Sequence, residues 1–424
     1  MYNEISKQLI EFIKKSPTCF HAVQTMSDLL IEEGFTELKE NEKWKLEKGG
    51  KYFVTRNGSS LIAFTIPEQE MKGMRIMASH SDSPSFKIKE NPEMEAEGHY
   101  IKLNVEKYGG MLCAPWFDRP LSVAGRVIVR DPETGTLRTV LVNIDRDLVM
   151  IPNLAIHMNR EVNDGYKYNA QKDMLPLYGD ITAKDSFMKT IADAAGAAPD
   201  DILGHDLFLY NRQKASIWGA SEEFLSSARL DDLQCAFSSL KGFLAGEKKE
   251  YMAVHCVLDN EEVGSGTKQG AASTFLYDTL TRAHDSLGLS REDYLIHLAD
   301  SFMVSADNAH AVHPNYPEKM DPVNRTYLNG GIVLKFNANQ KYCTDGVSAA
   351  MFRDICQKAG VPVQTFTNRS DMMGGSTLGN ISNTQVALNT ADIGLPQLAM
   401  HSPYETVGVK DTEYLIRAAE VLFC

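Results

Sequence analysis

The fold is decided by one short stretch near the N-terminus, Met74-Arg75-Ile76-Met77-Ala78-Ser79-His80-Ser81-Asp82-Ser83-Pro84. Residues 74–78 are mainly apolar and predict a short buried strand. Residues 79–84 are small or polar and form turns readily. An open α/β sheet binds its ligands where its strands end in such polar clusters. The stretch therefore predicts an α/β fold with a functional site at His80 and Asp82.

The residues on either side support the α/β interpretation. Apolar residues at helical spacing predict a helix over residues 3–15, and Ser16-Pro17 predicts the N-cap and first residue of a second helix. A β-hairpin is expected over residues 52–65, where two apolar runs flank Asn57-Gly58. After about residue 220 the α/β alternation returns. The segments expected there are the strands Tyr251–Leu258, Phe302–Ala306, Ile332–Phe336 and Leu398–Met400, and the helices Asp345–Lys358 and Asp411–Phe423.

The central part of the chain has a different pattern. Short alternating segments at Tyr100–Val105, Val123–Val129 and Thr139–Val142 indicate β structure. The simplest organisation is one α/β domain interrupted by an inserted, mainly β domain. We place the α/β domain at residues 1–86 and 218–424, and the insertion at residues 87–217.

Composition excludes several classes of protein. The chain has 424 residues and a net charge of −13, from 56 Asp and Glu against 43 Lys and Arg, which argues against nucleic acid as its main partner. No run of about 18 apolar residues predicts a transmembrane helix, so no membrane partner is expected. Residues 1–15 lack the apolar region of a secretory signal. The seven cysteines are scattered without a Cys-x-x-Cys pair, which favours a reducing, cytoplasmic location.

Histidines and carboxylates recur at predicted strand ends and in the loops that follow. The set comprises His80, Asp231, Glu261, Glu262, Asp307 and His401. Imidazole and carboxylate ligands together suit zinc or another divalent first-row metal, and one shared carboxylate can hold two ions about 3.5–4 Å apart. Of two adjacent glutamates, one can bind metal while the other deprotonates a bound water. Each residue alone also fits a turn or a solvated surface, so the prediction of a metallohydrolase rests on the set.

Eight segments, in order along the chain, carry a resemblance to a known family. They are residues 78–84, 108–110, 116–126, 151–157, 229–231, 259–265, 307–316 and 396–402. Their joint order and spacing resemble the M18 family of metallo-aminopeptidases, the group of aspartyl aminopeptidase and aminopeptidase I. The resemblance implies a split catalytic α/β sandwich of the zinc-exopeptidase type with an inserted, mainly β dimerisation domain.

The resemblance also implies roles for individual residues. It implies two divalent ions per subunit, zinc first, with cobalt or manganese as alternatives. The implied metal ligands are His80, Asp231, Glu262, Asp307 and His401, with Asp231 bridging the two ions. Asp82 would orient His80, and Glu261 would act as the general base. The implied activity is removal of the N-terminal residue from short peptides.

The resemblance extends to the assembly. Family members form a tetrahedral dodecamer built from dimers, in which a histidine of the inserted domain reaches the active site of a neighbouring subunit. The matching residue is His157, which would stabilise the oxyanion of the tetrahedral intermediate. From the residues alone, a buried or interface histidine is the better interpretation of His157.

Three further residues, His310, Lys335 and Tyr342, match substrate-contacting positions of the family. A lysine within the apolar run 332–336 is unfavourable unless it is paired. The resemblance implies that Lys335 meets the side-chain carboxylate of an N-terminal Asp or Glu, which would provide such a partner. The alternatives for Lys335 are an internal salt bridge or a side chain that extends to solvent. Because some relatives prefer neutral N-terminal residues, a Leu-type preference is the alternative specificity.

Two other functions fit parts of the pattern. A carboxypeptidase or N-acyl amino-acid deacylase with two zinc ions would share the ligands but would not need a free α-amino group. An inactive relative that serves in assembly would have lost a ligand or the base, and every one of these positions is filled here. The aminopeptidase is therefore the function expected from the sequence.

Overall fold

The structure is a computed structural model and describes residues 2–424. Contacts between residues divide the chain into two units. The first unit consists of Met1–Asp82, Ala215–Met400 and Glu405–Cys424, and the second consists of Ser83–Lys214 and His401–Tyr404. The second unit thus interrupts the first along the sequence.

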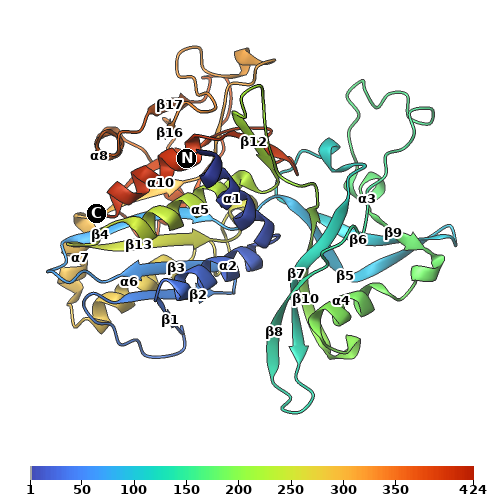
Figure 1. The fold of residues 1–424 in the computed structure, drawn as a ribbon, viewed down its shortest axis with the longest axis horizontal. Coiled ribbons are helices and arrows are strands. Elements are labelled where there is room, and N and C mark those ends of the chain that lie inside the picture. The colour runs from blue at the N-terminus through green and yellow to red at the C-terminus, as the bar shows by residue number, and fades with distance from the viewer. Residues whose placement is uncertain (1) are drawn as a thin grey trace. The chain divides into compact units, whose positions relative to one another are not determined.

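Nine strands of the described chain form the main sheet of the first unit, in the order β1-β2-β3-β13-β4-β14-β18-β16-β17 (Figure 1). The strands are β1 Thr36–Leu38, β2 Lys51–Arg56, β3 Ser60–Thr65, β4 Gly73–His80, β13 Tyr251–Leu258, β14 Phe302–Ala306, β16 Ile332–Phe336, β17 Val363–Thr367 and β18 Asn389–Gly394. The predicted strands that became β13, β14 and β16 are confirmed. The predicted hairpin is also confirmed, since β2 and β3 pair across Asn57 and Gly58, whose φ angles are 60° and 64°.

The centre of this sheet is parallel. β4 pairs in parallel with β13 on one side and with β14 on the other. In this register Leu258, the last residue of β13, lies opposite His80, the last residue of β4. The carboxyl ends of β4, β13 and β14 therefore lie side by side, at the edge where open α/β sheets bind ligands.

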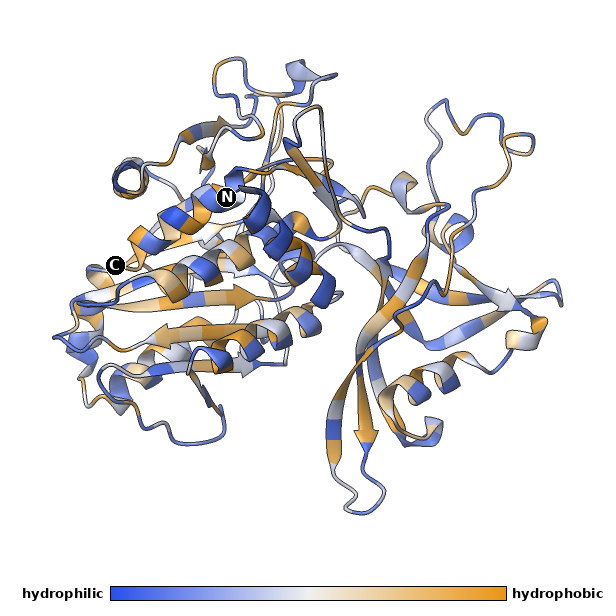
Figure 2. Cartoon of the chain, viewed as in Figure 1, coloured by the Kyte–Doolittle hydropathy of each residue, from blue (hydrophilic) through white to orange (hydrophobic). Residues whose placement is uncertain are grey.

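Helices cover both faces of the main sheet. One hydrophobic cluster packs α1 (Tyr2–Lys15), α2 (Cys19–Glu32), α5 (Leu230–Ala245), α8 (Gly346–Ala359) and α10 (Asp411–Leu422) against one face. A second cluster packs α6 (Phe275–Ser286), α7 (Arg291–Ala299) and α9 (Leu378–Ser382) against the other face. Within β13, Ala253 and Val257 belong to the first cluster and Val254 and Cys256 to the second, because side chains alternate along a strand. Figure 2 shows this pattern as hydrophobic strands flanked by helices that mix both kinds of residue.

The predicted helices in the last third of the chain are confirmed. Asp345 caps α8 by accepting the N–H groups of Val347 and Ser348, and Gly360 ends the helix with a φ of 63°. The predicted helix from Asp411 is α10.

A smaller sheet also belongs to the first unit, with five strands among the described residues in the order β11-β12-β20-β19-β15. They are β11 Ser216–Trp218, β12 Phe224–Ser227, β20 Glu405–Gly408, β19 Pro396–Leu398 and β15 Ala309–His310. The strand predicted over Leu398–Met400 was wrong in its position, because β19 ends at Leu398 and Ala399 has a φ of 55°, which ends extended structure.

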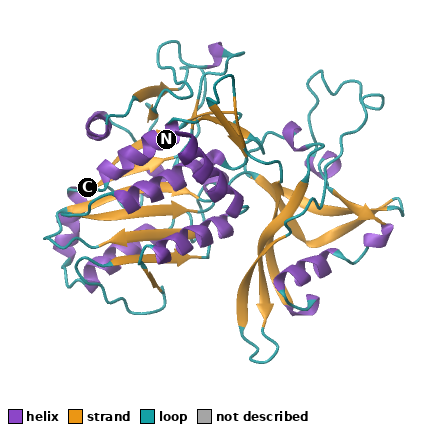
Figure 3. Cartoon of the chain, viewed as in Figure 1, coloured by secondary structure: helices purple, strands orange, loops and turns teal. Residues whose placement is uncertain are grey.

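The second unit is mainly β, as Figure 3 shows by its strands and loops. Its described strands form one sheet in the order β8-β7-β10-β5-β6-β9. They are β5 Ser85–Ala96, β6 Tyr100–Tyr108, β7 Leu121–Arg130, β8 Leu137–Asn143, β9 Leu177–Asp180 and β10 Ile202–Asn211, with helices α3 Ala170–Asp173 and α4 Phe187–Ala195. The three strands predicted in this region lie within β6, β7 and β8. Across residues 2–424, no helix is both long and apolar enough to cross a membrane.

The predicted start of the second helix was wrong. Thr18, with extended backbone, precedes the first residue of α2, Cys19, so Ser16 is not its N-cap. Ser16 instead ends α1, since its N–H bonds to the carbonyl of Ile13. The guanidinium of Arg229 donates to the carbonyls of both Ser16 and Ile13, at 3.0 and 3.2 Å. A contact from a distant part of the chain thus overrides the local capping signal.

Candidate active site

The predicted metal ligands of the first unit meet at the carboxyl ends of the parallel strands. His80 is the last residue of β4, and Asp307 directly follows β14. Glu261 and Glu262 lie in η4 (Glu261–Val263), a short 3₁₀ helix after β13. Asp231 lies at the start of α5. The order of the strands in the sheet, rather than the order of the residues in the sequence, therefore assembles this group.

His80 lies at the centre of the group and is buried. Its Nε2 lies 3.4 Å from Oδ1 of Asp231 and 4.0 Å from Oδ1 of Asp307. Ligand atoms of His80, Glu261 and Glu262 also lie within 4.8 Å of one another. The structure thus brings together five of the residues that the sequence singled out.

Asp82 connects His80 to the loop that carries the two glutamates. Its carboxylate accepts the backbone N–H groups of Glu261 and Glu262, at 3.1 and 3.2 Å. Nδ1 of His80 lies 3.1 Å from the Asp82 carbonyl oxygen and 3.4 Å from its Oδ1. In the neutral imidazole, an oxygen on this side accepts the Nδ1 proton, which leaves the lone pair on Nε2, the nitrogen that faces Asp231 and Asp307.

Two buried carboxylates near this group were missed by sequence reasoning. Oδ2 of Asp232 accepts the backbone N–H of His80 at 3.1 Å, and Asp232 also lies within reach of a shared ion. Oε2 of Glu405, in β20, accepts the backbone N–H of Asp231 at 3.0 Å. The Asp231-Asp232 pair was visible in the sequence, but no local pattern marked Glu405, which is 174 residues away.

The carboxylates are held in an environment that disfavours their charge. Burial and the charge of Asp231 raise the pKa of Asp307 and Glu262. Burial and the charge of Asp307 raise the pKa of Glu261 to about 8. Burial opposes the charged form of His80, but Asp231, Asp232 and Asp82 outweigh it and raise its pKa. Crowded negative charge of this kind is relieved by a cation.

The donor set fits divalent metal ions. It offers one imidazole nitrogen and several carboxylate oxygens, all buried or partly buried and within 4.8 Å of one another in overlapping groups. Zinc and similar ions take these ligands. His80 offsets part of this repulsion by lowering the pKa of Asp307, Glu261 and Glu262, and Lys335 does so for Asp307, but the pKa of all three carboxyl groups stays raised.

Lys335 approaches the same group from β16. The side chain is only 3% exposed, and its Nζ donates to the carbonyl of Asn308 at 2.9 Å. Nζ also lies 3.9 Å from Oδ2 of Asp307 and 5.4 Å from the ring centroid of Tyr342. Burial works against its charge, but Asp307 and Tyr342 outweigh burial and raise the pKa of Lys335. This contact corresponds to the alternative of an internal salt bridge, whereas the predicted contact of Lys335 with a substrate carboxylate stays a prediction.

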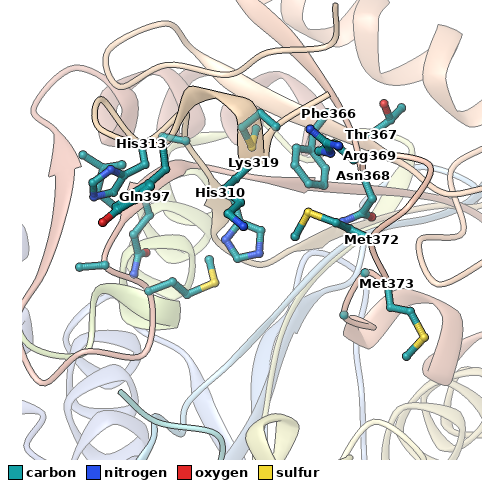
Figure 4. Close-up of a pocket in the computed structure, with 18 residues that line it drawn as sticks. His310, His313, Lys319, Phe366, Thr367, Asn368, Arg369, Met372, Met373 and Gln397 are labelled. Atoms are coloured by element: carbon teal, nitrogen blue, oxygen red, sulfur yellow. The ribbon is translucent and has the colours of Figure 1, made fainter. Parts of the chain in front are cut away.

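His310 and Tyr342 both pack edge-on against the ring of Phe366. The ring centroid of Phe366 is 6.1 Å from His310 and 6.2 Å from Tyr342. Beyond Phe366, His310 lines a cavity of about 320 Å³ (Figure 4).

The two remaining predicted residues belong to the second unit. Nδ1 of His401 lies 2.5 Å from the carbonyl oxygen of Gly110, so Nδ1 carries the proton and Nε2 the lone pair. His157 is exposed in the loop between β8 and β9, next to Leu154, Ile156 and Met158, which are 56%, 47% and 76% exposed. The alternative of a buried His157 is wrong within a single chain, whereas its predicted role at an interface stays a prediction.

His80 and the carboxylates around it form a candidate site for divalent metal ions, and comparison with known proteins identifies the family of the chain. The model of the family described as "Aminopeptidase I zinc metalloprotease (M18)" matches residues 12–423. The "Probable M18 family aminopeptidase 2" of Clostridium acetobutylicum is 49% identical over 426 residues, which cover 99% of this chain and 98% of that protein.

Two solved structures agree with the sequence match. A chain in the cryo-EM structure of the Ape4 and Nbr1 complex is 36% identical with a TM-score of 0.95, covering 100% of this chain and 86% of that one. The S. cerevisiae mApe1 dodecamer is 28% identical with a TM-score of 0.88, covering 100% of this chain and 97% of that one. The chain belongs to the M18 family of aminopeptidases, and it is an enzyme of the zinc metalloprotease type.

Proposed function

We propose that this enzyme is a two-metal aminopeptidase that removes N-terminal Asp and Glu from short peptides. The observation that carries the proposal is the group of buried carboxylates around His80, with the buried cation of Lys335 beside it. The first feature supports metal-dependent hydrolysis, and the second supports recognition of an acidic side chain.

We assign the metal ligands as His80, Asp231, Glu262, Asp307 and His401. Asp231 would be the ligand shared by the two ions, because its carboxylate lies within reach of both His80 and Glu262. Two bound divalent ions would lower the pKa of a water molecule and polarise the scissile carbonyl group. Zinc is the first candidate, and cobalt or manganese would accept the same ligands.

Glu261 is proposed as the general base. It takes a proton from the attacking water while the water oxygen bonds to the scissile carbonyl carbon. As the C–N bond breaks, Glu261 gives the proton to the leaving amine. Bound cations would lower the pKa of Glu261, so that its carboxylate could accept a proton from water and release it in the second step. Asp82 fixes the backbone of Glu261 and so positions the base.

His157 is proposed to act in the active site of a neighbouring subunit. Its loop exposes Leu154, Ile156 and Met158, an apolar surface that supports burial against another chain. The mApe1 relative is a dodecamer, and we propose the same assembly of dimers here. His157 would donate to the oxyanion of the tetrahedral intermediate.

Lys335 is proposed to bind the side-chain carboxylate of the N-terminal residue, with Tyr342 and His310 completing that pocket. The contacts of Lys335 with Asp307 and Asn308 also describe a purely structural ion pair, so the test must separate the two roles. The variant Lys335→Met should raise KM for Asp and Glu substrates about ten-fold or more and leave Leu substrates much less affected. An equal loss on both would exclude a role in specificity.

The proposed function is tested with p-nitroanilides of Asp, Glu, Leu and Lys, beside an N-acetyl-Asp control, using metal-free enzyme titrated with Zn²⁺, Co²⁺ or Mn²⁺. Metal-dependent cleavage of the Asp and Glu compounds, with the acetylated one inert, is the expected result. Faster cleavage of the Leu compound would keep the aminopeptidase and discard the acidic preference. Cleavage of the acetylated compound alone would point to the deacylase.

A further inference from the structure

The cavity next to His310 carries an unusual set of charges for this acidic protein. Its wall is formed by residues from 310–320, 366–375 and 397–400. Among the described residues that line it, none is acidic, although the chain has a net charge of −13. The cationic or imidazole side chains of the wall are His310, His313, Lys319 and Arg369. Figure 4 shows His310 in the middle of this lining, with Gln397 on one side and Met372 on the other.

Two hydrogen-bond donors of the wall lack an acceptor. The ammonium group of Lys319 is exposed and makes no hydrogen bond or ion pair with another side chain of the described residues. Gln397 is 2% exposed, and its Nε2 has no hydrogen-bond partner among residues 2–424. Exchanging the oxygen and nitrogen of the Gln397 amide would not remove the problem. Its Oε1 accepts from Nδ2 of Asn308, and a nitrogen in that place would face another donor. A buried amide donor without an acceptor is unfavourable by about 1–3 kcal/mol, and an anionic oxygen would satisfy it.

The carboxylate of Asp371 pairs with a cation of the cavity wall but does not itself line the cavity. Asp371 forms a bidentate pair with Arg369, at 2.9 and 2.7 Å, and its side chain is 65% exposed. The Glu318 backbone carbonyl also accepts from Arg369. Arg369 and Lys319 together lower the pKa of Asp371 to about 2, so Asp371 is charged and partly offsets the two cations. Removing its charge should therefore strengthen the attraction of the cavity for anions.

The cavity is separate from Lys335 but adjoins it. Phe366, which lines the cavity, lies 6.2 Å from the ring of Tyr342, and Tyr342 in turn lies 5.4 Å from Nζ of Lys335. Gln397 and Lys335 both contact Asn308, one through its side chain and the other through its carbonyl. A peptide with its first side chain at Lys335 would therefore extend its next residue toward the cavity.

We propose that this cavity binds a carboxylate of the peptide downstream of the cleaved residue. Lys319 and Gln397 are its donors, and the ligand is either the free C-terminus of a dipeptide or an acidic second side chain. The volume of about 320 Å³ lies within the range of small-ligand pockets. This proposal rests on the aminopeptidase function above and names a second feature of its substrates.

The test measures kcat/KM for matched substrate pairs with the metal-loaded enzyme. Asp-Ala against Asp-Ala-amide reports on the C-terminal carboxylate, and Asp-Glu-amide against Asp-Gln-amide reports on the side chain. The same pairs are made with Leu in the first position. In the wild type, kcat/KM should be higher for the anionic substrate than for the neutral one in at least one of these pairs. Lys319→Met should lower that ratio roughly three-fold, and Asp371→Asn should raise it by a similar factor, as expected for partly exposed charges.

The control is Lys45→Met, which removes an exposed lysine outside the cavity lining and should leave both ratios unchanged. A response of the first pair alone assigns the C-terminus, and a response of the second pair alone assigns the side chain. The proposal would be overturned if neither Lys319→Met nor Asp371→Asn changed the ratio of kcat/KM between anionic and neutral substrates. A failure of the acidic preference is distinguishable, because the Leu series would then be faster than the Asp series whatever the ratios within each.

Discussion

The Asp82→Asn variant examines how the active site is held together. In the wild type, one carboxylate accepts the N–H groups of both Glu261 and Glu262 and lies beside Nδ1 of His80. An asparagine keeps one carbonyl oxygen and replaces the other with an NH₂ group. One of the two backbone N–H groups must then face a donor instead of an acceptor.

The size of the effect follows from these contacts. The variant loses one hydrogen bond to a charged acceptor, which contributes about 1.5–3 kcal/mol. Because Glu262 is a proposed ligand, the loss should weaken metal binding by about ten- to a hundred-fold, a range typical of groups that orient metal ligands. The backbone carbonyl of Asp82, which also faces His80, is unchanged, so metal binding should weaken without being abolished.

The assay is a titration of metal-free enzyme in zinc buffers, following both bound zinc and aminopeptidase activity. The expected result is a shift of both curves to higher free zinc, with activity largely recovered at saturation. A matched control is Asp131→Asn, since Asp131 also accepts two backbone N–H groups, at 3.0 and 2.8 Å, in a turn of the second unit. Unchanged zinc affinity in Asp82→Asn would refute the reasoning.

Three other perturbations have predictable outcomes. Burial lowers the pKa of His255 from 6.5 to about 3, so below pH 6.5 only the unfolded state takes up a proton and stability falls. Between pH 8 and pH 5 the free energy of unfolding should therefore fall by about 2 kcal/mol because of His255. Urea unfolding at both pH values should show a fall about 2 kcal/mol smaller for His255→Gln than for the wild type. An equal fall in both proteins would contradict the low pKa of His255. A Cβ added at Gly379, in α9, would lie 2.7 Å from Oδ1 of Asp392, so Gly379→Ala should lower the free energy of unfolding by about 1–3 kcal/mol. The measurement is Tm, and an unchanged Tm would contradict this steric conflict. Glu405→Ala leaves the N–H of Asp231 without its acceptor and should reduce zinc affinity about ten-fold, whereas Glu405→Gln should retain most of it; chelator competition measures both, and equal affinities for all three proteins would exclude a positioning role for Glu405.

The parts of the fold that the sequence predicted are those with strong local signals. β13, β14 and β16 are short apolar runs bounded by turn residues, and their limits match the prediction. The start of α2 was wrong, because the Arg229 guanidinium holds the end of α1 at Ser16, a contact that no local pattern reveals. The strand predicted before His401 was misplaced because Ala399 has a positive φ, which ends β19 at Leu398, and the sequence around Ala399 does not reveal that angle.

In the candidate active site, too, the sequence predicted the residues that have a local signal and missed those that depend on distant contacts. Residues such as His80 and Asp307 were visible because each follows a recognisable strand and carries a typical metal-binding side chain. Glu405 was not visible, because its role depends on a hydrogen bond to the backbone of a residue far away in the chain. The unsatisfied amide of Gln397 likewise depends on the hydrogen bond that Asn308 makes with its other end. Such features appear only when the side chains are placed.

We propose above that two metal ions share Asp231 at the carboxyl ends of the parallel strands. The most direct measurement is anomalous diffraction at the zinc edge from crystals of the zinc-loaded enzyme. The account predicts two peaks per chain, about 3.5–4 Å apart, with Asp231 in contact with both and His80 in contact with one. A single peak, or a pair that Asp231 does not bridge, would contradict it.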